Sequence, residues 1–381
     1  MTPSAMSRRG ERVPPDQKKM RRVTEFHDGF SDGLEPLSPL DLTKYDTVSD
    51  LVEGMAKCSF GARRVGEAAQ VLQKMVEDKD CFKVLTLSGA MTPAKMGLVV
   101  CDMIDWGMVD AVVSTGAIMA HGLVESTGRA HFKHRPDMND TLLYHRGYNR
   151  IYDTIELESN LDDMEVIYRN VMERISGKKS ISSFEINRLI GESLSCETEE
   201  CHRGILKSAY QKEVPVYVPA FTDSELGLDF GVYMRRMKLK GKRPVNFDAM
   251  ADLEDYTSRV LASKKLGIFT VGGGVPRNWA QQVGPYLDII QKRVGVGGGF
   301  KRFQYAIRVC PEPVHWGGLS GCTYSEGVSW GKIVPSGEGG RYVEVLDDAT
   351  IAWPIIVKAV MERLEKKEPW KTIAKEAKSK R

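Results

Sequence analysis

Short apolar runs alternate with amphipathic stretches along most of the chain. The runs are rich in valine and isoleucine and end in Gly, Ser, Thr or Asp, which is typical of buried strands. They occupy residues 83–89, 109–117, 214–224, 266–274, 304–309 and 342–350. Between them, apolar residues recur at helical spacing. This alternation predicts a parallel sheet with helices on both faces.

The expected fold class is α/β, with a doubly wound, mostly parallel Rossmann-like sheet behind a small helical layer. We expect four segments along the chain. They are a flexible basic arm at 1–35, the helical layer at 36–80, one catalytic domain at 81–366 and a basic tail at 367–381. The middle of the chain is expected to be mostly helical. No composition break divides residues 81–366, so one domain is favoured over two.

Composition narrows the function classes. The chain has 381 residues, of which 42% are hydrophobic and 28% charged, so it is long enough for a substantial core. The net charge of +3 comes largely from basic ends without an aromatic platform, which argues against nucleic-acid binding. No run approaches the ~18 apolar residues of a membrane span. The seven scattered cysteines suit reduced thiols, and we expect a cytoplasmic protein.

Small and acidic residues follow each expected strand. In parallel sheets, ligands bind beyond the carboxyl ends of the strands, where glycine lets the backbone approach phosphate and a carboxylate can bind ribose. The best candidate is "GIFTVGGGVPRNW", a strand, three glycines and a helix start. It departs from the Gly-x-Gly-x-x-Gly fingerprint. Nucleotide binding and a plain strand-to-helix turn both remain open on this pattern.

Other motifs are weaker. "GVSWGKI" has the wrong glycine spacing for a phosphate-binding P-loop and Ile333 where Ser or Thr would hold magnesium. The histidines in "HGLVESTGRAHFKH" have no acidic partner at a recognisable spacing. "CETEECH" brings Cys196, Cys201 and His202 together on an expected helix, but a cysteine spacing of five is not a standard structural-zinc pattern. No metal site is predicted.

Lys332 lies in "SEGVSWGK", among glycine and tryptophan. In a pocket bounded by Trp330, desolvation would lower the pKa of its amine and favour the neutral form that imine chemistry requires. Alternatively, its aliphatic stem packs on Trp330 while the ammonium stays in water. The spacing alone leaves both readings open.

At these residues the chain resembles the deoxyhypusine synthase family. The resemblance runs from about residue 45 to 365 and is densest in "SEGVSWGKI", where the family carries its catalytic lysine. The other matching segments are "VDAVVSTGA", "PAFTDSELG", "VGGGV" and "DDATIAWP". The family implies an NAD-dependent transferase that takes a 4-aminobutyl group from spermidine or a related polyamine through an imine on its lysine. The acceptor is a lysine of translation initiation factor 5A, or putrescine in the related homospermidine synthases.

The resemblance also implies roles for individual residues. Lys332 is the expected covalent carrier. The expected substrate-binding residues are Glu326, Trp330, His121, Asn278 and Asp229. The expected NAD-contacting residues are Thr115, Asp223, Gly273, Asp348 and Ala349. A homotetramer with shared active sites is implied as well.

Several positions depart from the family pattern. Ala120 and His121 stand for two adjacent glutamates, Asn278 stands for a histidine, and Leu319 and Leu228 stand for aspartates. Asp229 is the candidate substitute for the last of these. The lost anionic contacts indicate a changed amine substrate. An NAD-dependent amine dehydrogenase and a catalytically weak regulatory paralogue are therefore kept as alternatives.

Overall fold

The computed structural model describes residue 24 and residues 26–175, 177–199, 201–318, 321–368 and 370–379. Residues 1–38 and 39–381 form two separate units. Most of the expected basic arm, and Leu319, lie outside the described residues. All the helices and strands discussed below belong to the second unit. No described helix combines the length and the apolar character needed to cross a bilayer.

Six parallel strands form the central sheet, as the apolar runs predicted. They are β1 (Cys81–Leu87), β2 (Ala111–Ser114), β7 (Val216–Tyr217), β9 (Lys265–Val271), β10 (Phe303–Val309) and β11 (Arg341–Val345). Their order in the sheet is β11-β10-β9-β1-β2-β7. The chain therefore turns outward in opposite directions from β1 and β9, and this topological switch is where a doubly wound sheet opens a crevice.

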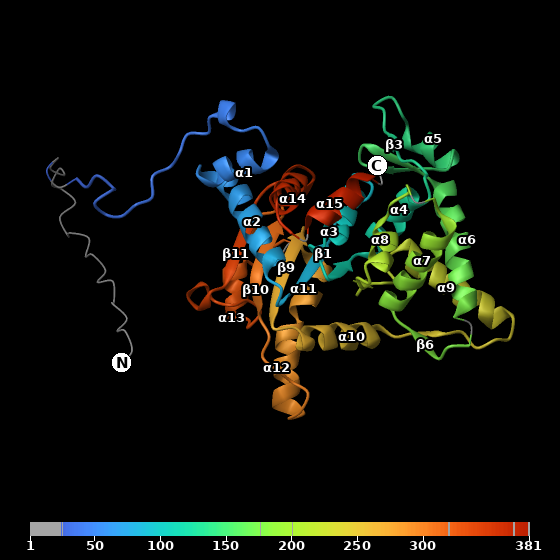
Figure 1. Ribbon diagram of the computed structural model, residues 1–381. Coiled ribbons are helices and arrows are strands. Elements are labelled where there is room, and N and C mark those ends of the chain that lie inside the picture. The colour runs from blue at the N-terminus through green and yellow to red at the C-terminus, as the bar shows by residue number, and fades with distance from the viewer. Residues whose placement is uncertain are drawn as a thin grey trace. The chain divides into compact units, whose positions relative to one another are not determined.

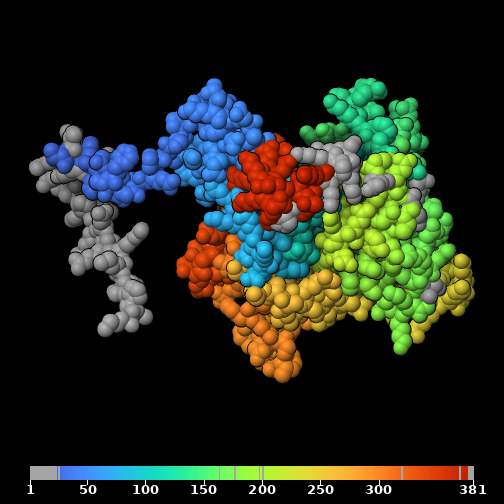
Figure 2. Space-filling model, viewed as in Figure 1, coloured from blue at the N-terminus to red at the C-terminus, as the bar shows by residue number. Residues whose placement is uncertain are grey.

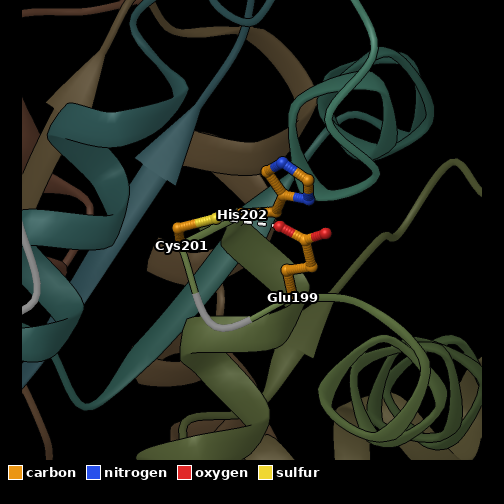
Figure 3. Close-up of side chains that lie close together, drawn as sticks. All are labelled: Glu199, Cys201 and His202. Atoms are coloured by element: carbon orange, nitrogen blue, oxygen red, sulfur yellow. Dashed lines mark hydrogen bonds between the residues drawn. The ribbon is translucent and has the colours of Figure 1, made fainter.

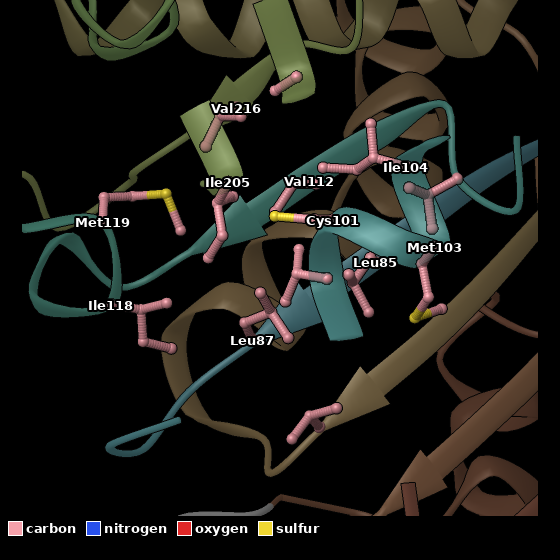
Figure 4. Packing of buried hydrophobic residues seen from close by; sticks show 14 of the residues in the cluster. Leu85, Leu87, Cys101, Met103, Ile104, Val112, Ile118, Met119, Ile205 and Val216 are labelled. Atoms are coloured by element: carbon pink, nitrogen blue, oxygen red, sulfur yellow. The ribbon is translucent and has the colours of Figure 1, made fainter. Parts of the chain in front are cut away.

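Helices cover both faces of this sheet, which confirms the expected fold class (Figure 1). Side chains alternate along β1: Leu85 and Leu87 enter one core, whereas Val84 enters the other. The first core includes residues of α2 (Phe60–Glu77), α3 (Gly97–Asp105) and α14 (Ala349–Glu365). Figure 4 shows Leu85 and Leu87 beside the α3 residues Cys101 and Met103. The second core includes residues of α10 (Ala249–Ala262), α11 (Gly274–Gln281) and α12 (Val283–Arg293).

The two ends of the second unit pack together. Helix α1 (Val48–Ala56) and helix α2 both contact α14, and in Figure 2 the C-terminal residues in red lie next to these blue helices. The segment expected as a basic tail contains helix α15 (Trp370–Ser379). Trp370 Nε1 donates a hydrogen bond to the carbonyl oxygen of Trp106 at 3.2 Å, and Ala374 is buried. This amphipathic helix therefore covers part of the core.

The middle of the chain is mostly helical, as expected, but it also contains short strands that were not predicted. It contains helices α4 (Gly116–Ser126), α5 (Asp140–His145), α6 (Glu158–Arg174), α7 (Ser183–Glu197), α8 (Ile205–Gln211) and α9 (Glu225–Leu239). It also contains a small antiparallel sheet of β3 (Phe132–Lys133), β5 (Thr154–Leu157) and β4 (Tyr148–Ile151), and a pair of β6 (Ser180–Ile181) with β8 (Asn246–Phe247). These strands are short and partly polar, so they carry almost no periodic apolar signal.

Candidate active site

A cleft lies at the carboxyl ends of the central strands, where the sheet topology switches. Its volume is about 310 Å³. It is lined by Ser88, Gly89, Thr115, Ala220, Asp223, Gly272, Gly273, Gly274, Val275, Pro276, Cys310 and Glu312. Three residues expected to contact a nucleotide, Thr115, Asp223 and Gly273, are therefore brought together.

The turn after β9 is built around Ser88 of the neighbouring strand end. Ser88 Oγ accepts a hydrogen bond from the backbone N–H of Gly273 at 2.9 Å. Gly272 has φ +80°, and a Cβ there would lie 2.3 Å from Ser88 Oγ. Glycine is thus required both by the left-handed backbone and by the close approach of the two loops. The turn leads directly into α11, whose first residues line the cleft.

The amine of Lys332 contacts α11 about one helical turn beyond the residues that line the cleft. Lys332 Nζ donates a hydrogen bond to Oδ1 of Asn278 at 3.1 Å. Asn278 is four residues beyond Gly274, or roughly 6 Å along the helix axis at the usual helical rise. The cleft and the lysine are therefore joined through α11. Sequence spacing could not reveal this contact, because the two side chains are 54 positions apart.

Lys332 is only 7% exposed. Burial lowers the pKa of its amine, the Cys322 thiol opposes that change, and the guanidinium of Arg277 lowers the pKa further. No carboxylate among the described residues forms an ion pair with it. Its hydrogen-bond partner Asn278 is exposed, and Nζ lies 5.8 Å from the ring centroid of Trp330, which is also exposed.

Arg277 positions the segment that precedes the lysine motif. Its guanidinium is buried, donates a hydrogen bond to the carbonyl oxygen of Cys322 at 2.7 Å and stacks 4.8 Å above the Tyr324 ring. Tyr324 is itself buried at the start of helix α13 (Tyr324–Ser329). Sequence analysis missed Arg277, since a buried arginine next to a proline carries no periodic signal.

Two other residues of the candidate site lie elsewhere. Glu326 is exposed on α13, and among the described contacts its carboxylate is not paired with Lys332. Asp229 is half-buried on α9, where burial and the neighbouring carboxylate of Glu165 raise its pKa to about 6. Asp229 thus faces the acidic residues of α6.

Asp348 and Ala349 are not among the residues that line the cleft. They follow β11, the edge strand of the sheet. The Asp348 carboxylate accepts a hydrogen bond from the backbone N–H of Thr350 at 2.7 Å and caps helix α14, while Ala349 is buried. In this structure Asp348 caps α14, and Ala349 packs in the core.

His121 belongs to a buried ionic network beside the cleft. Its Nδ1 lies 2.5 Å from Oε2 of Glu156, and Nε2 of His131 lies 3.5 Å from the other oxygen of that carboxylate. Lys95 Nζ contacts Nδ1 of His131 at 3.1 Å. The Glu225 carboxylate lies 3.8 Å from Nε2 of His121. His121 and His131 do have an acidic partner, and sequence analysis missed it because Glu156 lies on an unpredicted strand.

The pKa values of this network follow from its contacts. Burial opposes protonation of His121, but the hydrogen bond and charge of Glu156 raise its pKa. Burial alone would raise the pKa of Glu156, yet the two imidazoles lower it to about 2. The carboxylate therefore stays ionised and binds two histidines, so it is not available as a free anionic group.

Comparisons with known proteins agree with this architecture. A family model described as "Deoxyhypusine synthase" matches residues 50–360. "Probable deoxyhypusine synthase 2" of Methanosarcina acetivorans is 36% identical over 329 residues, covering 86% of this chain and 90% of that protein. A "Deoxyhypusine synthase-like protein" of Chlorobaculum parvum is 33% identical over 326 residues, covering 84% and 88%.

A solved structure resembles the fold. The "Crystal Structure of a putative deoxyhypusine synthase from Entamoeba histolytica" aligns with a TM-score of 0.52 at 15% sequence identity. The alignment covers 85% of this chain and 96% of that one. At this identity the match concerns the fold alone.

Proposed function

The chain belongs to the deoxyhypusine synthase family, and on that premise we propose that it is an NAD-dependent transferase that acts through Lys332. The group transferred is 4-aminobutyl, taken from spermidine or a related polyamine. The acceptor is an amine, either a lysine of translation initiation factor 5A or putrescine, which gives homospermidine. The observation that carries this proposal is the buried Lys332 amine with a lowered pKa.

The cleft residues are suited to a dinucleotide. Gly272 has no side chain, and the loop after β9 therefore lies close to Ser88. The absence of a side chain would let a diphosphate approach the backbone N–H groups of this loop. Asp223 and Thr115 line the same cleft, and a carboxylate there would accept hydrogen bonds from ribose hydroxyls. When bound, NAD takes a hydride from the amine substrate and returns it at the end of the transfer.

Lys332 carries the transferred group between these redox steps. Oxidation of the secondary amine of spermidine gives an imine and releases a proton. The neutral Lys332 amine adds to that imine carbon, the carbon–nitrogen bond to 1,3-diaminopropane breaks, and the diamine leaves with the proton from lysine. The four-carbon fragment is then held as an imine on Lys332. An acceptor amine displaces lysine by the same exchange.

The remaining residues bind and orient the amines. Asn278 holds the Lys332 amine by a hydrogen bond, with Trp330 beside it, and the indole ring attracts an ammonium through its face. Glu326, which is exposed on helix α13, supplies a carboxylate for an ammonium group at the far end of the polyamine. We further propose the homotetrameric assembly of the family and a cytoplasmic location.

Trapping of the imine tests this proposal. The protein is incubated with NAD and a panel of spermidine, homospermidine, putrescine and agmatine, reduced with borohydride and digested for mass spectrometry. An adduct on Lys332 with one of these amines is expected. Binding without any adduct favours a regulatory paralogue. Amine oxidation that persists in Lys332→Arg, whose side chain stays protonated, favours a dehydrogenase.

NAD binding is tested separately at the turn after β9. Gly272→Ala places a methyl group against Ser88 Oγ and is expected to weaken NAD binding about tenfold or more by isothermal titration. Gly241→Ala is the matched control: its φ of +67° carries similar strain, but no atom lies within 4 Å of the added carbon. Unchanged NAD affinity in Gly272→Ala would contradict the proposal that NAD binds in this cleft.

A further inference from the structure

Three possible metal ligands converge in the loop between α7 and α8. The ligand atoms of Glu199, Cys201 and His202 all lie within 4.8 Å of one another. In Figure 3 the three side chains project toward a common point, and the Cys201 thiol contacts Oε2 of Glu199 at 3.5 Å. Glu199 and Cys201 are exposed, and His202 is half-buried. The cluster is on a loop, so the expectation of a helix here is wrong.

A buried lysine holds the backbone of this loop. Lys207, on α8, is 3% exposed. Its Nζ donates hydrogen bonds to Oγ1 of Thr198 at 3.0 Å and to the carbonyl oxygens of Glu199 at 2.7 Å and His202 at 3.1 Å. A buried ammonium needs these acceptors, so the loop cannot move away without a large desolvation cost. The contacts use Thr198 and backbone carbonyls, and they leave all three ligand side chains available.

The same loop is fixed to two further helices. Arg203 Nη2 pairs with Asp102 at 2.9 Å and Asp105 at 2.7 Å, both on α3. The His202 ring lies over Gly128, just beyond α4, where a Cβ would come within 2.5 Å of the ring. The position of the His202 imidazole is therefore fixed by packing against Gly128. A pre-positioned ligand set loses less conformational entropy when an ion binds.

The donor set indicates which ion fits. One thiolate, one imidazole and one carboxylate suit Zn²⁺, whereas Mg²⁺ and Ca²⁺ prefer oxygen ligands alone. Zinc bonds of about 2.0–2.3 Å place tetrahedral ligands about 3.3–3.8 Å apart. Atoms within 4.8 Å of one another need to close by at most about 1.0–1.5 Å, which side-chain torsions allow.

We propose that Glu199, Cys201 and His202 bind one Zn²⁺ ion, with water in the fourth position. On binding, the thiol of Cys201 loses its proton to solvent as the sulfur–zinc bond forms. None of these residues lines the cleft at the strand ends. The site therefore does not depend on the proposed transferase function, and its occupation would tie Glu199 to Cys201 and His202 within the α7–α8 loop.

Cobalt spectroscopy tests the site in the full-length protein. The reduced, chelator-treated protein is titrated with Co²⁺, whose thiolate complexes absorb strongly in the near ultraviolet. One equivalent should produce that band together with the visible absorption of a tetrahedral ion, and Zn²⁺ should abolish both. Because Cys201 and His202 must be deprotonated, affinity is expected to fall as the pH decreases.

Variants decide which residues bind. Cys201→Ser should remove the thiolate band, and His202→Gln and Glu199→Gln should each weaken binding at least tenfold. Cys196→Ser is the matched control, since this exposed cysteine of the same segment is outside the cluster. Metal-free melting curves check that each variant folds. A thiolate band that survives in Cys201→Ser, or no stoichiometric binding to the unaltered protein, would overturn the proposal.

Discussion

Lys332 and Glu156 are both buried ionisable side chains, yet their surroundings act on them in opposite ways. Lys332 meets one amide oxygen, and no carboxylate among the described residues pairs with it, so burial lowers the pKa of its amine. Glu156 is fully buried between two histidines, and these partners lower its pKa to about 2 despite burial. Burial makes an amine neutral and reactive only where no opposite charge compensates it.

The comparison also bears on what the two regions do. The network of Glu156 joins α4, β5 and the residues before β3, so its charges are used for structure. The Lys332 amine has a lowered pKa and two exposed neighbours, Asn278 and Trp330, and the proposed function uses this amine as its nucleophile.

Replacing Lys332 tests whether its amine is the nucleophile. Lys332→Arg keeps a cation but is expected to abolish the borohydride-trapped adduct and to reduce transfer by on the order of 10³-fold or more, because a guanidinium stays protonated. Turnover and intact-mass analysis measure this. Lys292→Arg is the control, since Lys292 is exposed on α12 and paired with Asp288. Full transfer activity in Lys332→Arg would rule out the covalent role.

Removing the Glu156 carboxylate tests whether the buried ionic network stabilises the fold. Glu156→Ala leaves two histidines without their counter-charge and is expected to destabilise the fold by about 3 kcal/mol. Denaturant unfolding measures this loss. Glu158→Ala, two residues away and exposed, should change stability little. An equal loss of unfolding free energy in both variants would show that the ionic network of Glu156 does not contribute specifically to stability.

The pH dependence of that loss follows from the two pKa shifts. The raised pKa of His121 contributes stability below its ordinary value of 6.5, and this is lost as the pH rises through the folded-state pKa. The lowered pKa of Glu156 contributes stability above 4.5, which is lost as the pH falls toward about 2. The difference between Glu156→Ala and the unaltered protein should therefore be largest between these two ordinary values.

Adding a carboxylate beside Lys332 should make the two regions alike. Asn278→Asp places an anion where the amide accepts the hydrogen bond from the amine, so the pKa of Lys332 should rise by about one unit at this exposed position. Transfer at neutral pH should fall about tenfold, and the acidic limb of the kcat/KM profile, along which Lys332 loses its proton, should move to higher pH. Asn278→Gln keeps an amide and serves as the control. A profile that moves downward in Asn278→Asp would contradict the assignment.

The smallest effect is expected at the indole ring. Trp330 lies 5.8 Å from Nζ of Lys332 and stabilises the ammonium by about 0.5–1 kcal/mol. Trp330→Leu should therefore lower the pKa of Lys332 by less than one unit, measured by the pH dependence of its chemical labelling. Trp316→Leu, another exposed tryptophan, should leave that pKa unchanged. Equal shifts in both variants would argue against a specific contact.

Sequence analysis located the elements that have strong apolar signals. The six central strands and the glycine turn after β9 were predicted because buried runs and turn residues are local features. The sheet of β3, β4 and β5 was missed because its strands are short and partly polar. Cys201 and His202 were placed on a helix, but α8 begins only at Ile205, after Gly204.

The candidate site was predicted only in part for the same reason. The resemblance to the family named Lys332, Thr115, Asp223 and Gly273 through short motifs, and the last three line the cleft, while the roles of all four stay predictions. The contact between Lys332 and Asn278 and the binding of His121 to Glu156 join residues far apart in the chain. No local pattern encodes such contacts, since they depend on how helices and strands pack.

The most direct test of the account is the titration of Lys332 itself. Trace acetylation of the folded protein across pH 6–11, read by mass spectrometry against a free lysine derivative, gives the pKa of this amine. We predict a midpoint below the ordinary lysine value of 10.5. A midpoint at or above 10.5 would show that the amine is held as an ammonium and would contradict the proposed covalent role.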